Sequence, residues 1–186
     1  MAFDLVQYFA EQIKIQKPQL LNQYPPEERK NYLLEINALT LGKLVNLWEQ
    51  KEDVVYQEIQ NVDHLYLQEI ARHLTTSSHN QSQLTKPDLE HATIEILELQ
   101  LKELKQLDET GSFGKRGLRE LILGQIEHLS GQAEDWVWST NNLKVLIGSK
   151  PIMQEELSLD ETMKEFNQMV NTQKEHTQAE VLAVKP

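Results

Sequence analysis

The chain of 186 residues contains no cysteine. This absence excludes disulfide bridges, a thiol nucleophile and zinc sites with thiolate ligands. No apolar run approaches the roughly 18 residues that a membrane-spanning helix needs. The first residues, MAFDLVQYFAEQ, lack the basic segment of a signal peptide. We therefore expect a soluble, cytoplasmic protein that has no membrane as a partner.

Common motifs of nucleotide-binding and hydrolytic enzymes are also missing. The sequence contains no P-loop, no G-x-G-x-x-G, no H-E-x-x-H and no G-x-S-x-G motif. The glycine-rich segment 111–117 (GSFGKRG) differs from a phosphate-binding loop, because Arg116 follows Lys115 where Ser or Thr is required. The six histidines are scattered and form no recognisable nucleophile arrangement. These absences favour a non-enzymatic role, and the sequence predicts no cofactor.

Basic residues are scarce, since 18 Lys and Arg against 29 Asp and Glu give a net charge of -11. Binding to the phosphates of nucleic acid requires Lys and Arg, so nucleic acid is an unfavourable direct ligand. Residues 51–110 contain 5 basic and 12 acidic residues, residues 111–150 contain 5 and 4, and residues 151–186 contain 3 and 7. A basic partner is therefore expected at the two acidic segments, and an acidic partner near Lys115 and Arg116.

Apolar residues recur every three to four positions along most of the chain, and no run alternates as in a β-strand. This pattern predicts an all-α protein, a compact bundle of six or seven helices with a flexible C-terminal end. Gly42 lies inside one predicted helix, where it costs about 1 kcal/mol relative to alanine and indicates the close approach of another helix. The bundle helices are predicted at about residues 3–13, 25–50, 52–74, 88–108, 118–131 and 133–147.

The chain is predicted to consist of two parts, a helical bundle and a C-terminal segment. Residues 1–150 form the bundle, with a polar linker at 75–87 inside it. Residues 151–186 form an amphipathic helix and a disordered tail, because a capping box precedes an apolar stripe and the end of the chain is polar. This stripe either packs on its own bundle or docks in a groove of a partner. It consists of Leu159, Met163, Phe166 and Val170.

A candidate metal site lies on the predicted helix 52–74. Glu69 and His73 are one turn apart and fall on its apolar arc, so we expect both to face the core. An antiparallel next helix brings Asp88 close to them. Inward Glu and His ligate iron in helical bundles, but such sites need more carboxylates and Glu-x-x-His pairs than this chain offers. A buried, hydrogen-bonded Glu–His pair, or a position at the boundary of the core, is therefore favoured over a metal site for the two residues.

Two further groups are candidates for partner contact. A predicted helix begins near three basic residues, Lys115, Arg116 and Arg119. Positive charges are unfavourable at the positive end of a helix dipole, so we expect an anion to neutralise them. That anion is a phosphate group, an acidic patch of a partner, or an acid of the chain itself, such as Glu120 or those of helix 88–108. A flexible turn between helices, with no ligand, is the favoured interpretation of the segment. Trp136 and Trp138 lie two positions apart, so one helix does not easily bury both, and one of them is a candidate for an interface.

The favoured hypothesis is a non-enzymatic, acidic helical bundle that acts by binding another protein. The roles that fit are adaptor, inhibitor, immunity-type neutraliser and assembly factor, and a homo-oligomer is left open. One alternative is a helical-bundle protein that binds a metal through inward Glu and His ligands. A second alternative is a regulator that associates with nucleic acid or mimics it.

Overall fold

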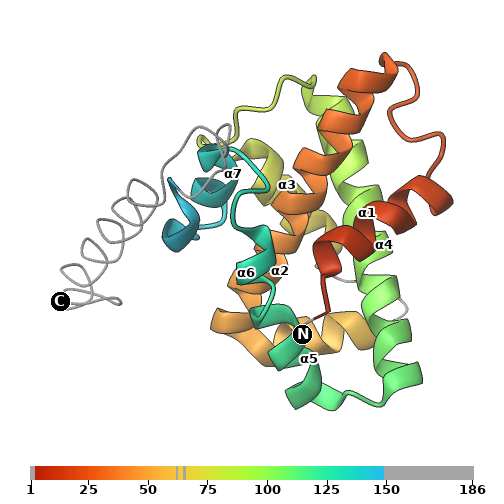
Figure 1. Cartoon of the computed structure of the whole chain (residues 1–186), viewed down its shortest axis with the longest axis vertical. Helices are drawn as coiled ribbons and strands as arrows, with labels where there is room; N and C mark the ends of the chain where they lie inside the picture. The colour runs from red at the N-terminus through yellow and green to blue at the C-terminus, as the bar shows by residue number, and fades with distance from the viewer. Residues whose placement is uncertain (1–2, 62, 65, 149–186) are drawn as a thin grey trace, which may run out of the picture.

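The computed structural model describes residues 3–61, 63–64 and 66–148, and within these ranges the chain is helical and contains no strand. The predicted all-α bundle is confirmed (Figure 1). The predicted helix and tail at 151–186 lie outside the described residues. The elements are α1 (Leu5–Gln16), α2 (Pro26–Gln60), α3 (Leu67–Thr76), α4 (Lys86–Gly111), α5 (Gly114–Leu123), α6 (Ile126–Leu129), α7 (Asp135–Thr140) and the short 3₁₀ helix η1 (Lys144–Leu146).

The structure differs from the prediction after residue 50. The predicted helix 52–74 does not exist as one unit, because its first part continues α2 beyond a kink at Lys51 (φ -141°, ψ 61°). The helix then ends at Gln60, and α3 begins at Leu67. The buried carboxylate of Glu58 stabilises this break, since its Oε2 accepts a hydrogen bond from the backbone N–H of Tyr66 at 3.0 Å. Apolar spacing alone does not reveal such a turn.

The predicted helix 118–131 is likewise divided, into α5 and α6, at the buried residue Gln125. The side chain of Gln125 ties this junction to the start of α1. Its Oε1 accepts from the backbone N–H of Leu5 at 2.8 Å, and its Nε2 donates to the carbonyl of Phe3 at 2.7 Å. The N-terminal segment is thereby held against the end of α5 by a contact between residues about 120 positions apart in the sequence.

Helix α2 is the centre of the bundle. In Figure 1 it runs between α1 and α4 on one side and α6 and α7 on the other, and these helices and α5 all contact it. Residues 36–42 are buried without interruption, so this part of α2 has neighbours on every side. Its polar members are paired. Asn37 Nδ2 donates to the carbonyl of Val6 at 3.1 Å, and Gln100 Nε2 donates to Asn37 Oδ1 at 2.9 Å. These bonds connect α1, α2 and α4 inside the core.

The close approach predicted at Gly42 is confirmed, although the neighbour is the turn after α7 rather than a helix. A Cβ at Gly42 would lie 2.7 Å from Asn141 Nδ2 and 3.3 Å from Leu143 Cδ1. Asn141 Nδ2 in turn donates to the carbonyl of Leu39 at 2.8 Å, so the turn is bonded directly to the backbone of α2. Gly42 therefore provides the space in which the α7–η1 segment packs.

Among the described helices, none is both long and apolar enough to cross a membrane.

We predict that Gly42→Ala lowers the free energy of unfolding by about 1–2 kcal/mol, because the clash with Asn141 outweighs the gain in helix propensity. Urea denaturation measures the change. Gly111→Ala, whose Cβ would meet only the half-exposed ring of Phe113 at 3.3 Å, is the matched control and should be neutral or stabilising. In a double-mutant cycle, Gly42→Ala and Asn141→Ala should cost less together than the sum of the two. A stabilised Gly42→Ala protein would show that the turn does not pack as described.

Candidate functional site: the kink of helix α2

The kink at Lys51 is held on one side by α5. Arg119 donates to Glu52 through two nitrogens, with Nε 2.5 Å from Oε1 and Nη2 2.7 Å from Oε2. The same Glu52 Oε1 accepts from Trp48 Nε1 at 3.0 Å. The hydrogen bonds from Arg119 are the main reason that the pKa of the Glu52 carboxyl lies below its ordinary value. A forked arginine–carboxylate contact thus joins α5 to the first turn after the kink.

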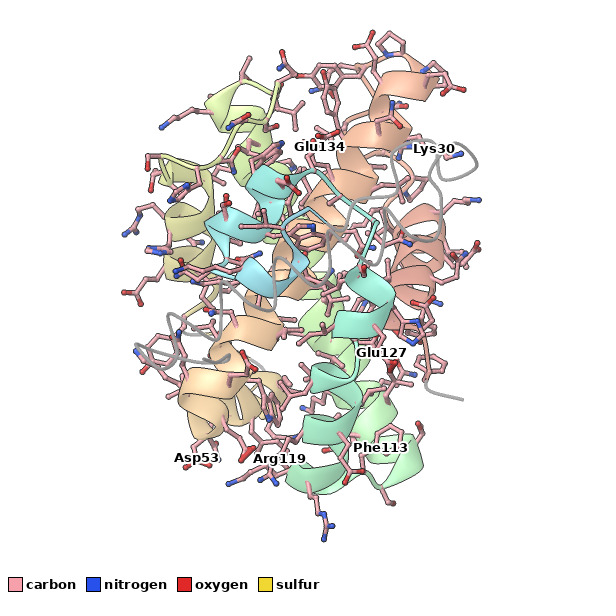
Figure 2. All side chains as sticks on the ribbon, turned by 60° about the vertical axis from the view of Figure 1, so that its left-hand side comes forward. Lys30, Asp53, Phe113, Arg119, Glu127 and Glu134 are labelled. Carbon is pink, nitrogen blue, oxygen red and sulfur yellow. The ribbon has the colours of Figure 1, made fainter. Side chains whose placement is uncertain are left out.

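A second ion pair lies beside the first. Lys115 Nζ is 2.5 Å from Asp53 Oδ1 and 5.9 Å from the centroid of the Tyr56 ring. Figure 2 shows Asp53 and Arg119 at the same end of the molecule. The hydrogen bond to Asp53 raises the pKa of Lys115 above its ordinary value. Both pairs are exposed to solvent, so each contributes little alone, and together they orient α5 on the kink.

These pairs show where the predicted anion-contact residues lie. Lys115 and Arg119 face acids of the chain itself, but these are Asp53 and Glu52 of α2, not the acids of helix 88–108 that the sequence suggested. The side chain of Arg116 is 85% exposed, and its Nε lies 3.7 Å from Oε2 of Glu120 on the same helix. A phosphate or a partner's acid at Lys115 or Arg119 would compete with Asp53 or Glu52.

The other side of the kink carries exposed apolar side chains. Val54 is 41% exposed and Tyr66 is 46% exposed. Together with the partly buried Leu47 and Ile70 and the exposed Lys51, they line one small groove between α2, α3 and α4. We call these four residues, Leu47, Val54, Tyr66 and Ile70, the kink patch. Tyr66 belongs to the same apolar arc of the predicted helix 52–74 as Glu69 and His73, and the sequence therefore predicts that it faces the core. This prediction is wrong, because the turn before α3 rotates that residue outward.

Beneath the kink patch lies the buried carboxylate of Glu58, which is 3% exposed. His64 belongs to the same turn, with its Nδ1 3.1 Å from the Glu58 carbonyl and 4.0 Å from Glu58 Oε2. This is the kind of Glu–His pair that the sequence predicted at Glu69 and His73. It was missed because residues six positions apart do not meet on a helix, and meet here only because the chain turns back.

The predicted metal-site residues do not form a common cavity. Glu69 and His73 are both exposed, so the prediction that they face the core is wrong. The break before Leu67 starts a new helix, whose rotation does not follow from the residues before it. Asp88 is half-buried and accepts from the hydroxyl of Tyr24 at 2.6 Å, which lowers the pKa of its carboxyl. Among the described residues, no group of three His, Cys, Asp or Glu side chains could hold a metal ion.

The two tryptophans predicted as interface candidates differ in exposure. Trp138 is fully buried and is one of the largest side chains of the core. Trp136 is half-buried and packs against that core. Of the pair, only Trp136 presents surface to solvent. The stripe of Leu159, Met163, Phe166 and Val170 lies outside the described residues.

A carboxylate with a shifted pKa lies away from the kink, on the first half of α2. Burial and the negative charge of Glu134 raise the pKa of Glu35 to about 7, against an ordinary value of 4.5. Glu134 precedes α7, so the repulsion acts between α2 and the segment that packs on it. Glu35 is therefore a group whose charge opposes the packing of α7.

Comparison with known proteins adds no function to these observations. No family model, no curated protein and no solved structure matches the chain.

The shifted pKa of Glu35 predicts how stability depends on pH. Below about pH 4.5 the folded and unfolded states both hold the proton. As the pH rises from there through about 7, only the folded state keeps it, so stability falls. Glu35→Gln should remove this loss and raise the free energy of unfolding at pH 8 by about 1–2 kcal/mol, with no gain at pH 4.

Urea denaturation at pH 4, 6 and 8 measures this difference. Glu127→Gln, at an exposed position, is the matched control and should show no such dependence on pH. A gain for Glu35→Gln that is equal at all three pH values would contradict the shifted pKa.

Proposed function

We propose that the protein acts without catalysis, by binding a segment of another protein at the kink patch. The observation that supports this proposal is the exposure of Val54 and Tyr66 beside the partly exposed Leu47 and Ile70 in one groove. Contiguous apolar surface on an otherwise charged protein is typical of a site for protein–protein contact. Exposed aromatic side chains such as that of Tyr66 are typical anchors of such contacts.

The charges around the kink patch define the chemistry of the partner. Asp53 directly precedes Val54; Lys115 pairs with one of its oxygens, but the side chain of Asp53 is 82% exposed and open to a second cation. Lys51, which also lines the groove, is the cation on the patch side. Glu69 directly precedes Ile70 and is also exposed. The surrounding segment, residues 51–110, has 12 acidic against 5 basic residues. The partner is therefore a segment with apolar side chains flanked by Lys or Arg, and the acids of this protein accelerate and orient its approach.

This mode of binding fits an adaptor, an inhibitor, an immunity-type neutraliser or an assembly factor. The two alternative functions, metal binding and mimicry of nucleic acid, each require a site of different composition. A metal-binding function needs converging ligands, whereas Glu69 and His73 are exposed on the surface of α3. A nucleic-acid mimic needs a continuous acidic surface, whereas the kink patch is apolar at its centre.

The proposal is tested by site-specific photo-crosslinking followed by measurement of affinity. A photoreactive amino acid at Val54 of the full chain should capture one partner, and the same amino acid at Ile15, which is 66% exposed on α1, should not capture it. Titration calorimetry with the captured partner then compares Val54→Ser and Tyr66→Ser with the matched control Ile15→Ser. We expect each patch variant to weaken binding roughly tenfold, which is about 1.4 kcal/mol, and the control to have no effect.

The affinity should also fall as salt is added, because the flanking charges contribute to binding. Equal capture from Val54 and Ile15, or an affinity unchanged by both patch variants, would exclude the kink patch as the binding site. Capture of a second copy of this chain would replace the proposed partner by a homo-oligomer.

A further inference from the structure

The face of α2 that carries the kink patch also carries two lysines. Lys43, Leu47 and Lys51 follow one another at intervals of four residues, so their side chains project from the same side of the helix. Lys51 is exposed and lines the same groove as the kink patch, and Lys43 is half-buried. The apolar surface of the patch is therefore bordered by positive charge along α2.

These two lysines lack a counter-charge. Within the described part of the chain, neither of them forms an ion pair. Burial lowers the pKa of Lys43, and the positive charge of Lys51 lowers it further. A carboxylate brought to this face of α2 would relieve the repulsion between the two ammonium groups and would be attracted by both.

The described part of the chain ends beside the same stretch of α2. A Cβ at Gly42, the residue before Lys43, would lie 3.3 Å from Leu143 Cδ1. The backbone N–H of Gly148, five residues after Leu143, donates to Asp135 Oδ1 at 2.9 Å, which holds it at the start of α7. Helix α7 contacts α2 and lies beside it in Figure 1. The residues that follow Gly148 therefore start next to α2.

The chain after Gly148 is long enough to cross to the kink patch. Residues 149–158 precede the predicted apolar stripe, and ten residues of extended chain span up to about 33 Å. Along the axis of α2, at about 1.5 Å per residue, Leu47 is about 7.5 Å from Gly42, and Val54 is about 18 Å from it. The stripe can therefore reach both ends of the patch.

The C-terminal segment, residues 155–170, has the side chains that this face of α2 lacks. It contains 5 acidic residues and 1 basic residue. In the helix that the sequence predicts there, Glu156 and Asp160 fall beside the apolar stripe, because each precedes a member of the stripe by three positions. The stripe consists of Leu159, Met163, Phe166 and Val170. The segment thus offers apolar side chains to the patch and carboxylates to the two lysines.

We propose that the C-terminal segment docks on the kink patch of its own chain, with its acids toward Lys43 and Lys51. The apolar stripe then covers Val54 and Tyr66, which are 41% and 46% exposed without it. The tether favours this contact, because a short linker provides an effective concentration on the order of millimolar. Even a weak interaction between the segment and the patch is therefore sufficient for docking.

The docked segment regulates the binding of a partner, a consequence that rests on the function proposed above. Asp53 and Glu69 lie at the edge of the patch, and a predominantly acidic segment does not match their charge. A partner with Lys or Arg beside its apolar side chains pairs with these acids and displaces the segment. A ligand that lacks such charges competes less well, so the segment increases the specificity of the patch.

Paramagnetic relaxation in the full chain tests the docking without any partner. The chain contains no cysteine, so Asn167→Cys provides a single site for a nitroxide label next to Phe166. We expect the label to broaden the amide signals of Val54 and Tyr66. The signal of Lys30, near the start of α2, should keep its width.

Variants of the labelled chain separate the apolar from the charged contribution. Phe166→Ser should remove the broadening, whereas Gln168→Ser, on the opposite side of the predicted helix, is the matched control and should retain it. Lys51→Glu should also remove it, and Lys30→Glu, at another exposed lysine of α2, should not. Added salt should reduce the broadening. Unshifted amide signals of the core verify that each variant is folded.

Docking is overturned if Val54 and Tyr66 keep their line width, or if Phe166→Ser and Gln168→Ser change it equally. A mixed sample identifies contact between copies, with one chain isotope-labelled and the other carrying the nitroxide. Broadening in that sample would overturn docking within one chain.

The regulatory consequence is measured by calorimetry with the captured partner. If the segment occupies the patch in about 90% of molecules, Phe166→Ser should tighten binding roughly tenfold. An unchanged affinity, with the broadening present, would contradict the regulation and leave the docking in place. Broadening together with a partner affinity that Val54→Ser does not alter would contradict the proposed function alone.

Discussion

The rest of the structure depends on the enclosure of residues 36–42 of α2, which are buried on every side. A helix in this position has no face for unpaired polar groups, so its asparagine must bond to neighbouring elements. Asn37 does so to Val6 and Gln100, which fixes α1 and α4 relative to α2. Because Gly42 has no side chain, the turn at Asn141 comes close enough for Asn141 to donate a hydrogen bond to the carbonyl of Leu39. The central helix thereby determines where each surrounding helix packs.

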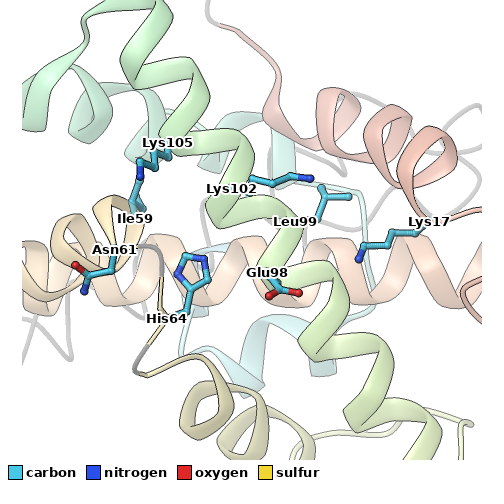
Figure 3. Close-up of a pocket in the computed structure, with 8 residues that line it drawn as sticks. All are labelled: Lys17, Ile59, Asn61, His64, Glu98, Leu99, Lys102 and Lys105. Carbon is cyan, nitrogen blue, oxygen red and sulfur yellow. The ribbon is translucent and has the colours of Figure 1, made fainter.

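The kink patch arises where this enclosure ends. Beyond Lys51, α2 is no longer surrounded, and two exposed ion pairs with α5 orient its last turns. The side of these turns that faces α3 leaves Val54 and Tyr66 exposed in the kink patch. On the other side, the end of α2 and the turn after it, at Ile59 and His64, line one pocket with Lys102 and Lys105 of α4 (Figure 3). Glu58 stabilises the turn that separates the two surfaces.

Features that depend on neighbours in the sequence could be predicted, and features that depend on distant contacts could not. The all-α fold, the helix boundary near Lys51 and the close approach at Gly42 follow from apolar spacing and from the cost of glycine in a helix. The break at 61–66 depends on the side chain of Glu58, and apolar spacing continues through it. Because this turn is not predicted, Glu69 and His73 are expected in the core, whereas they are exposed on α3. The partners of Arg119 and Lys115 are more than 60 positions away, so no local pattern identifies them.

Amide hydrogen exchange tests the central role of α2 most directly. If residues 36–42 are enclosed as described, the amides of this part of α2, residues 36–46, should be the slowest of the chain and should exchange only by global unfolding. Residues 52–60, beyond the kink, should exchange faster, through local opening of the contacts with α5. Exchange in residues 36–46 that is as fast as in residues 52–60 would contradict the account, because α2 would then not be the helix on which the others pack.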